Sequence, residues 1–232
     1  MSLLFRCHSK LQVSHEGPMV KRNSPLHLRQ SDLDSACGPH CALMALMLFG
    51  IVNRDDIEDQ DDLRLSPNKS LAKMWKRSAS FYFTGTAAKD LQSVFEPYNK
   101  SINSRLLRKA ERIAKCIESL EGDGTCIVGL HNDDWSHWSL VIGVSSRDDF
   151  DSAESLLLLD PDAPIIPLSA WNATLSVKAN SKGMHKYETA AMTTKVVIDS
   201  ALALTPRVDE IELEIDIETA LGLEEDLEDY EL

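Results

Sequence analysis

The sequence contains no apolar stretch that approaches the roughly 18–20 residues needed for a membrane-spanning helix. Its first residues lack the basic and then apolar pattern of a signal peptide, so none is expected. The five cysteines are odd in number and irregularly spaced, at positions 7, 37, 41, 116 and 126, which argues against a disulfide framework. We therefore expect reduced thiols, no membrane partner and a cytoplasmic location.

Basic residues are also scarce, since 24 Lys and Arg stand against 37 Asp and Glu, for a formal net charge of −13. The excess lies at the C-terminus, where residues 207–232 contain twelve acids and one base. Phosphate binding requires a basic surface, so nucleic acid is not expected as a partner. The remainder of the chain is close to neutral.

A long apolar run after Cys37 indicates a buried helix. Pro39 suits its first turn, where the missing N–H has no partner to lose, and Gly50 is a suitable end. Residues 42–49 are apolar on every side, as expected for a helix at the centre of a core. Further helices are predicted over residues 71–81, 87–95 and 104–120.

Strand patterns dominate the second half of the chain. They cover residues 125–130, 138–144 and 156–159, followed by a strand pair or one bulged strand over 195–204. A helical N-terminal half followed by such strands predicts an α+β fold in which the buried helix packs on an antiparallel β-sheet. Residues 1–206 are expected to form this domain.

The acidic tail, residues 207–232, carries its own pattern. Apolar and acidic residues alternate over 211–217, which is typical of a half-buried strand. This strand either packs on the sheet of the domain or pairs with the sheet edge of a protein partner.

Three residues in chain order have the chemistry of a cysteine nucleophile and its partners. Cys37 begins the predicted helix, where unpaired N–H groups and the helix dipole favour a thiolate. His137, which starts one predicted strand, would exchange protons with the thiol and the leaving group. Asp160, which ends the next strand, would orient His137. In an antiparallel hairpin these strand ends are adjacent, so we expect His137 and Asp160 to share one edge of the sheet.

The oxyanion that forms during acyl transfer needs hydrogen-bond donors. The backbone N–H of Cys37 is one candidate donor. The side-chain amide of Gln30, seven residues upstream, is the other. Trp135 and Trp138 flank His137, and one of them is expected to shield it from water while the other packs inside the protein.

Several short motifs, in a fixed order, carry a resemblance to a known family. They are Gln30, Cys37-Gly38-Pro39, Gly85-Thr86, His137-Trp138-Ser139 and Asp160-Pro161. The order resembles that of the papain-like cysteine peptidases in their C39 and C39-like branch, where the Gln usually stands six residues before the Cys. The resemblance implies a papain-like fold and a thiol peptidase that needs no metal or cofactor. It also implies Cys37 as nucleophile, His137 as base, Asp160 as orienting residue and Gln30 as oxyanion donor.

Other interpretations of these residues remain open. Each residue alone has a structural explanation, as a packed thiol, a strand histidine or an Asp-Pro turn. Cys37, His40, Cys41 and His137 together offer four ligands of the kind that zinc prefers. The function predicted is hydrolysis of a peptide or isopeptide bond in a protein or peptide substrate, and transfer of the acyl group to another amine would use the same residues. The alternative is a binding or regulatory module without turnover that acts through its acidic tail.

Overall fold

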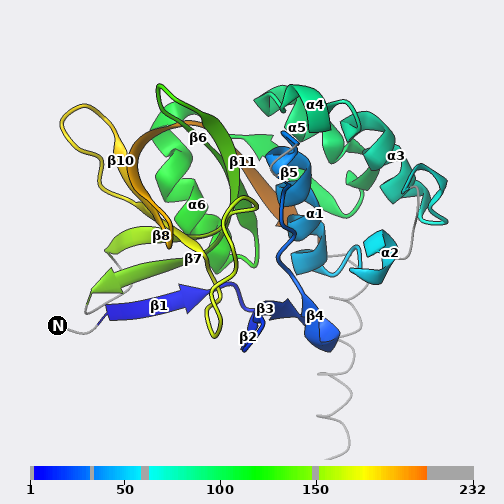
Figure 1. Cartoon of the computed structure of the whole chain (residues 1–232), viewed down its shortest axis with the longest axis horizontal. Helices are drawn as coiled ribbons and strands as arrows, with labels where there is room; N and C mark the ends of the chain where they lie inside the picture. Colours follow the sequence, from blue (N-terminus) through cyan, green and yellow to red (C-terminus); the bar gives the residue numbers. More distant parts are fainter. Residues whose placement is uncertain (1–2, 32–33, 59–62, 148–151, 208–232) are drawn as a thin grey trace, which may run out of the picture.

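A closed antiparallel barrel of six strands forms the centre of the molecule (Figure 1). The computed structural model describes residues 3–31, 34–58, 63–147 and 152–207. Neighbouring strands follow the order β7, β6, β11, β10, β9, β8, and β8 pairs again with β7. Their bounds are β6 (Thr125–His131), β7 (Ser136–Arg147), β8 (Ala153–Leu159), β9 (Ala173–Ser176), β10 (His185–Thr189) and β11 (Thr193–Pro206).

Five further strands of the described residues lie outside the barrel. β1 (Leu3–Cys7) pairs with the second half of β7, and β5 (Ile102–Leu106) pairs with the end of β11. A separate sheet contains β2 (Gln12–Ser14), β3 (Gly17–Val20) and β4 (Ser24–Pro25). The pairing of β1 depends on a glycine, because a Cβ at Gly143 would lie 2.6 Å from the carbonyl oxygen of Arg6.

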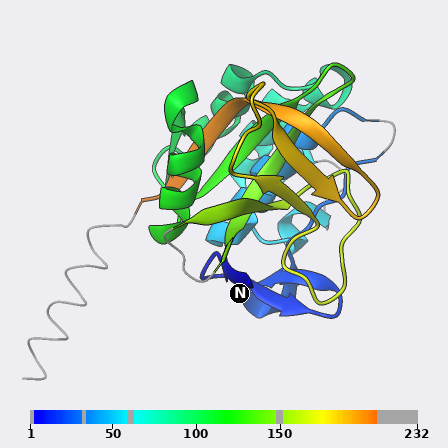
Figure 2. The same ribbon diagram turned by 90° about the vertical axis from the view of Figure 1, so that its left-hand side faces the viewer.

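The helices occupy two sides of the barrel. In Figure 1, α1 (Cys37–Phe49) lies between the barrel and a group of short helices, and Figure 2 shows α6 (Arg112–Glu121) against another side of the barrel. The short helices are α2 (Asp55–Glu58), α3 (Lys69–Ser78), α4 (Phe81–Thr84) and α5 (Ala88–Val94). Single 3₁₀ turns are η1 (Lys21–Asn23), η2 (Leu63–Leu65), η3 (Glu96–Tyr98) and η4 (Lys109–Glu111).

The predicted fold class is wrong. We expected a papain-like α+β fold with a helical half packed on an antiparallel sheet, whereas the sheet closes on itself and strands (35%) exceed helices (30%). The closure depends on β9 and β10, which the sequence did not reveal, because these two strands connect β8 to β11. Each has only four or five residues and no apolar run, so neither has a clear strand pattern.

The helix predicted over residues 104–120 is also wrong in its first half. Residues up to Leu106 form β5, and the helix α6 begins only at Arg112. The side chain of Glu111 accepts a hydrogen bond from the backbone N–H of Arg108 at 2.9 Å, which is the capping arrangement that starts a helical turn at this point. Pairing with β11 therefore overrides the helical periodicity of the upstream residues.

The other main elements are confirmed. The helix that starts at Cys37 ends at Gly50, which has φ of 75° and donates its N–H to the carbonyls of Leu46 and Met47. The predicted strands correspond to β6, β7 and β8, and residues 195–204 belong to one strand, β11, with a bulge between Ile198 and Ser200.

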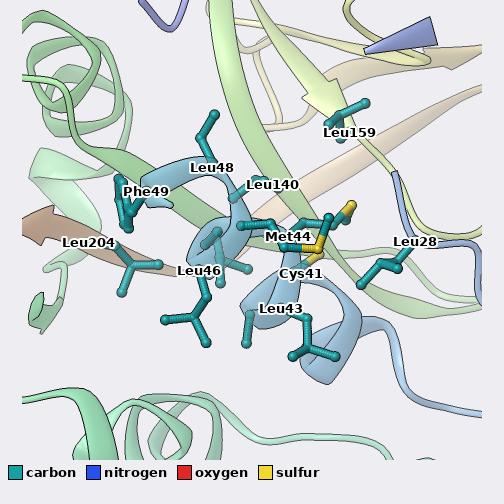
Figure 3. Packing of buried hydrophobic residues seen from close by; sticks show 14 of the residues in the cluster. Leu28, Cys41, Leu43, Met44, Leu46, Leu48, Phe49, Leu140, Leu159 and Leu204 are labelled. Carbon is teal, nitrogen blue, oxygen red and sulfur yellow. The ribbon is translucent and has the colours of Figure 1, made fainter. Parts of the chain in front are cut away.

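Two apolar clusters lie on opposite faces of the barrel wall. All six barrel strands contribute to the inner cluster, on which α6 packs through Cys116 and Leu120. The outer cluster surrounds α1, and Figure 3 shows Leu140, Leu159 and Leu204 of the strands around this helix. Neighbouring residues of β6, β7, β8 and β11 enter different clusters, as the two-residue period of a strand allows, whereas β9 and β10 contribute only to the inner cluster.

Within the described ranges no helix has the length and apolar character needed to cross a membrane. The strand predicted over residues 211–217 lies outside those ranges, so the role of the tail stays a prediction, as does the boundary of the domain at residue 206. The five cysteines are free thiols.

Candidate active site

Cys37 is the first residue of α1 and is only 7% exposed. The turn before it is held by Asp34, whose carboxylate accepts hydrogen bonds from the backbone N–H groups of Ser31 (3.0 Å) and Ala36 (2.9 Å). As a first-turn residue, Cys37 has a backbone N–H with no carbonyl partner inside the helix. The thiol and this N–H are therefore both placed at the positive end of α1.

Gly38 allows a second segment to approach the start of α1. A Cβ at this position would lie 2.8 Å from Oγ1 of Thr86, which is closer than side chains tolerate. The carbonyl of Thr86 in turn accepts a hydrogen bond from the indole of Trp138 at 2.9 Å. The segment before α5 is therefore packed directly between α1 and β7.

His137 and Asp160 lie side by side at one end of the β7–β8 hairpin. His137 is the second residue of β7, Asp160 directly follows β8, and Leu140 is paired with Leu159 between them. His137 Nε2 lies 2.7 Å from Asp160 Oδ1, so Nδ1 is the ring nitrogen left for Cys37. The structure thus brings together the two residues that the sequence placed at neighbouring strand ends.

The charged forms of His137 and Asp160 stabilise each other. Burial alone would lower the pKa of His137, but the charge and hydrogen bond of Asp160, together with the hydrogen bond and charge of Cys37, raise the pKa to about 10. Burial alone would raise the pKa of Asp160, but His137 and the hydrogen bonds from Tyr187 and the backbone of Asp162 hold it below its usual value. At neutral pH the pair is therefore an imidazolium and a carboxylate.

The carboxylate of Asp160 is only 2% exposed and is surrounded by donors. Oδ2 accepts hydrogen bonds from the hydroxyls of Tyr187 and Ser139, the latter at 3.1 Å. Oδ1 accepts from the backbone N–H groups of Asp162 (2.7 Å) and Ala163 (3.3 Å) in addition to His137. Buried charge is stable only when its hydrogen-bonding capacity is satisfied in this way.

The backbone of Asp160 is fixed by two further residues. Asn172 accepts from the N–H of Asp160 at 2.7 Å and donates to its carbonyl at 2.8 Å. His27 Nε2 lies 2.8 Å from the same carbonyl. Sequence reasoning missed His27, Asn172 and Tyr187 in these roles, because they match no local motif. Ser139 belongs to the His137-Trp138-Ser139 motif, but its bond to Asp160 was not predicted.

The two tryptophans beside His137 have different roles. Trp138 is 7% exposed and packs in the α1 cluster. Trp135 places its ring edge-on to His137, with centroids 5.6 Å apart, and also contacts Tyr187 at 5.9 Å. Trp135 is therefore the residue that shields the His137–Asp160 pair.

A cleft of about 570 Å³ contains Gln30, Cys37, His137 and Trp138 among its walls. Gln30 donates a hydrogen bond from Nε2 to the carbonyl of Asp34 at 2.8 Å, which identifies the end of the amide that carries the hydrogens. Its backbone N–H donates to the carbonyl of Pro161 at 2.8 Å. The four residues predicted for catalysis therefore lie at this one cleft or, for Asp160, directly behind it.

The hydrogen bonds of His40 and Cys41 do not support the zinc interpretation. His40 Nδ1 donates to the carbonyl of Ala36 at 2.8 Å, and Cys41 Sγ donates to the carbonyl of Trp138 at 3.3 Å. In the part of the chain that the structure describes, no group of three His, Cys, Asp or Glu side chains is close enough to hold a metal ion.

Neither a known protein family nor a curated protein matches the chain. The argument about function therefore depends on the site itself.

Proposed function

We propose that this protein is a cysteine hydrolase that cleaves a peptide or isopeptide bond in a protein or peptide substrate through a thioester on Cys37. The observation that carries the proposal is the position of His137 between Cys37 and the buried carboxylate of Asp160. The order of these residues along the chain also resembles that in the C39-like cysteine peptidases, and this likeness supports the assignment of the residues but not the fold that it implied.

The proposed reaction begins with the proton of Cys37 on Nδ1 of His137 and a thiolate at Sγ. Sγ attacks the carbonyl carbon of the substrate, and the oxyanion accepts hydrogen bonds from Nε2 of Gln30 and the backbone N–H of Cys37. His137 gives its proton to the amine nitrogen, the C–N bond breaks, and a thioester remains. His137 then removes a proton from water, whose oxygen attacks the thioester. The C–S bond breaks, the product leaves as a carboxylic acid that gives its proton to solvent, and the thiolate forms a new pair with the imidazolium.

Asp160 acts in this scheme through His137. Its carboxylate keeps the proton of Nε2 in place, so that Nδ1 is the nitrogen that exchanges protons with sulfur, amine and water. Trp135 limits the access of water to the His137–Asp160 pair, which strengthens the electrostatic interaction. We propose a cytoplasmic location as well, since a nucleophilic thiol among five free cysteines suits a reducing compartment.

The proposal is tested by alkylation of the full chain with iodoacetamide at neutral pH, followed by mass spectrometry of each cysteine. Cys37 should react at least about tenfold faster than Cys7, which is more accessible but makes no hydrogen bond to an imidazole among the described residues. His137→Ala should remove this difference, and His40→Ala is the matched control that should keep it.

Turnover is measured in the same samples with a set of fluorogenic peptides and with acceptor amines, which distinguishes hydrolysis from acyl transfer. A fast Cys37 together with cleavage supports the enzyme. Equal labelling of Cys37 and Cys7, with no effect of His137→Ala and no turnover, would show that the protein is a binding module instead.

A further inference from the structure

A second cavity lies on the barrel side of His137. It has a volume of about 390 Å³ and shares Ser136 and His137 with the cleft that contains Cys37. We call this cavity the apolar pocket. Its walls are formed mainly by Trp135, Ala163, Pro164, Tyr187, Ala191 and Met192. The two cavities therefore meet at the histidine that the proposed reaction uses for proton transfer.

The positions of the catalytic atoms determine which part of a substrate lies in each cavity. Cys37 and Gln30 line the cleft and not the apolar pocket, so the acyl group and its oxyanion belong in the cleft. His137 must reach the amine nitrogen as the C–N bond breaks, so this nitrogen lies against the ring that separates the cavities. The chain that continues from the amine nitrogen then passes His137 toward the apolar pocket.

The chemistry of the two cavities selects the kind of residue that follows the scissile bond. Four carboxylates, those of Asp34, Asp90, Asp160 and Asp162, line the cavities. Among the described residues, no Lys or Arg lines either one. The imidazolium of His137 is the one cationic group among the described residues of these linings, and it is already paired with Asp160, so a terminal carboxylate or an acidic side chain would find mainly negative charge. An aliphatic or aromatic side chain would contact Trp135, Tyr187 and Met192 and displace water from apolar surface.

On the basis of the proposed function, we propose that the apolar pocket binds the side chain of the residue on the amine side of the scissile bond. That residue is aliphatic or aromatic, and the bond that is cut lies inside a chain rather than next to a free C-terminal carboxylate. The pocket and its chemistry thus define the substrate class as an internal peptide bond followed by an apolar residue.

One wall of the pocket can be changed without disturbing the fold. Ala191 and Met192 form the turn between β10 and β11, where their N–H groups donate to Oγ1 of Thr189 at 3.2 and 3.1 Å, and Thr189 donates its own N–H to the carbonyl of Met192. None of these bonds involves the side chain of Met192, which is 41% exposed. Met192→Lys therefore adds a positive charge to the pocket and leaves the turn intact.

The first experiment needs no turnover. Cys37→Ala protein labelled with ¹⁵N is titrated with Leu-Gly-amide and with Asp-Gly-amide, whose free amino group imitates the departing amine. The indole resonance of Trp135, assigned with a Trp135→Phe variant, reports on the pocket. It should shift with Leu-Gly-amide at concentrations at least about tenfold lower than with Asp-Gly-amide. Met192→Lys should reduce this ratio about tenfold, and Leu168→Lys, at a 75% exposed site outside both cavities, should leave it unchanged.

The second experiment measures kcat/KM of the wild-type chain on peptides that differ only in the residue after the scissile bond. Leucine, methionine or phenylalanine should exceed aspartate by at least about tenfold, and a peptide that ends at this residue with a free carboxylate should be cut more slowly than its amide. Equal binding of the two dipeptide amides, or a selectivity that Met192→Lys does not alter, would overturn the proposal. Absence of turnover with normal dipeptide binding would instead refute the hydrolase and leave the pocket established.

Discussion

Cys37 and Asp160 lie on opposite sides of His137 and are held by different kinds of structure. Cys37 is placed by a helix terminus and by a short turn fixed by Asp34, all within a few residues of chain. Asp160 is held by side chains of β7, β10, the segment before β9 and the loop before α1. Cys37 therefore depends on local geometry and Asp160 on the closed barrel, so substitutions around the two residues should have different effects on activity and stability.

The largest effect is expected from Cys37→Ser. A serine hydroxyl does not ionise beside an imidazole as a thiol does, so kcat/KM should fall by about 10⁴-fold or more while the thermal unfolding temperature changes little. Cys41→Ser is the matched control one helical turn away, since its hydroxyl can also donate to the carbonyl of Trp138. If Cys41→Ser lost as much activity as Cys37→Ser, the nucleophile would be wrongly assigned.

The pH dependence of stability tests the charged pair. The pKa of His137 is raised from 6.5 to about 10 in the folded protein, so its stabilising contribution is complete below pH 6.5 and is lost as the pH rises toward 10. The free energy of unfolding from urea titrations should therefore fall between about pH 7 and 10.

Asp160→Asn should flatten this pH dependence and lower stability at pH 7 by about 3 kcal/mol, because it leaves a buried imidazole without its counter-charge. His40→Gln is the control for the loss of a histidine on α1 outside this pair. An unchanged slope in Asp160→Asn would contradict an imidazolium–carboxylate pair.

A smaller effect on the barrel side is expected from Tyr187→Phe. This change removes one hydroxyl donor from Oδ2 of Asp160 but keeps the aromatic contact with Trp135, so stability should fall by about 1–3 kcal/mol. Activity should shift in its pH profile more than in its maximum, because the position of His137 is preserved. Tyr98→Phe, whose hydroxyl has no partner among the described residues, should be nearly neutral.

The smallest effect is expected on the helix side, from Gly38→Ala. The new Cβ must displace Thr86, which opposes the gain in helix propensity, so the net change in stability should be within about 1 kcal/mol. Alkylation of Cys37 should nevertheless change, because the packing at the start of α1 is altered, while the slope of stability with pH should stay as in wild type. A changed pH slope would mean that the two sides are not independent.

Much of the structure around Cys37 was predictable from sequence, because the residues that define α1 are contiguous in the chain. Pro39 and Gly50 mark the ends of α1, and the apolar run between them gives its burial. The barrel was not predictable in the same way. β10 has no apolar run that would predict a strand. Its one buried residue, Tyr187, reaches Asp160 only because β10 is paired with β9 and β11.

The hydrogen-bond partners of Asp160 show the same limit. His27 is 133 positions away in the chain, so no local pattern connects the two residues. The hairpin argument did place His137 beside Asp160, because neighbouring strand ends are fixed by pairing alone. Sequence patterns thus located the candidate catalytic residues, whereas the residues that hold Asp160 required the tertiary structure.

The bond between the backbone N–H of Gln30 and the carbonyl of Pro161 has an evolutionary consequence. Gln30 takes its position from the turn after Asp160 and from the carbonyl of Asp34, and not from a fixed number of residues before Cys37. The position of the Gln30 amide is therefore coupled to the segment around residues 160–163 as well as to the turn at Asp34. In relatives of this chain we expect changes around residues 27–30 to accompany changes around 160–163.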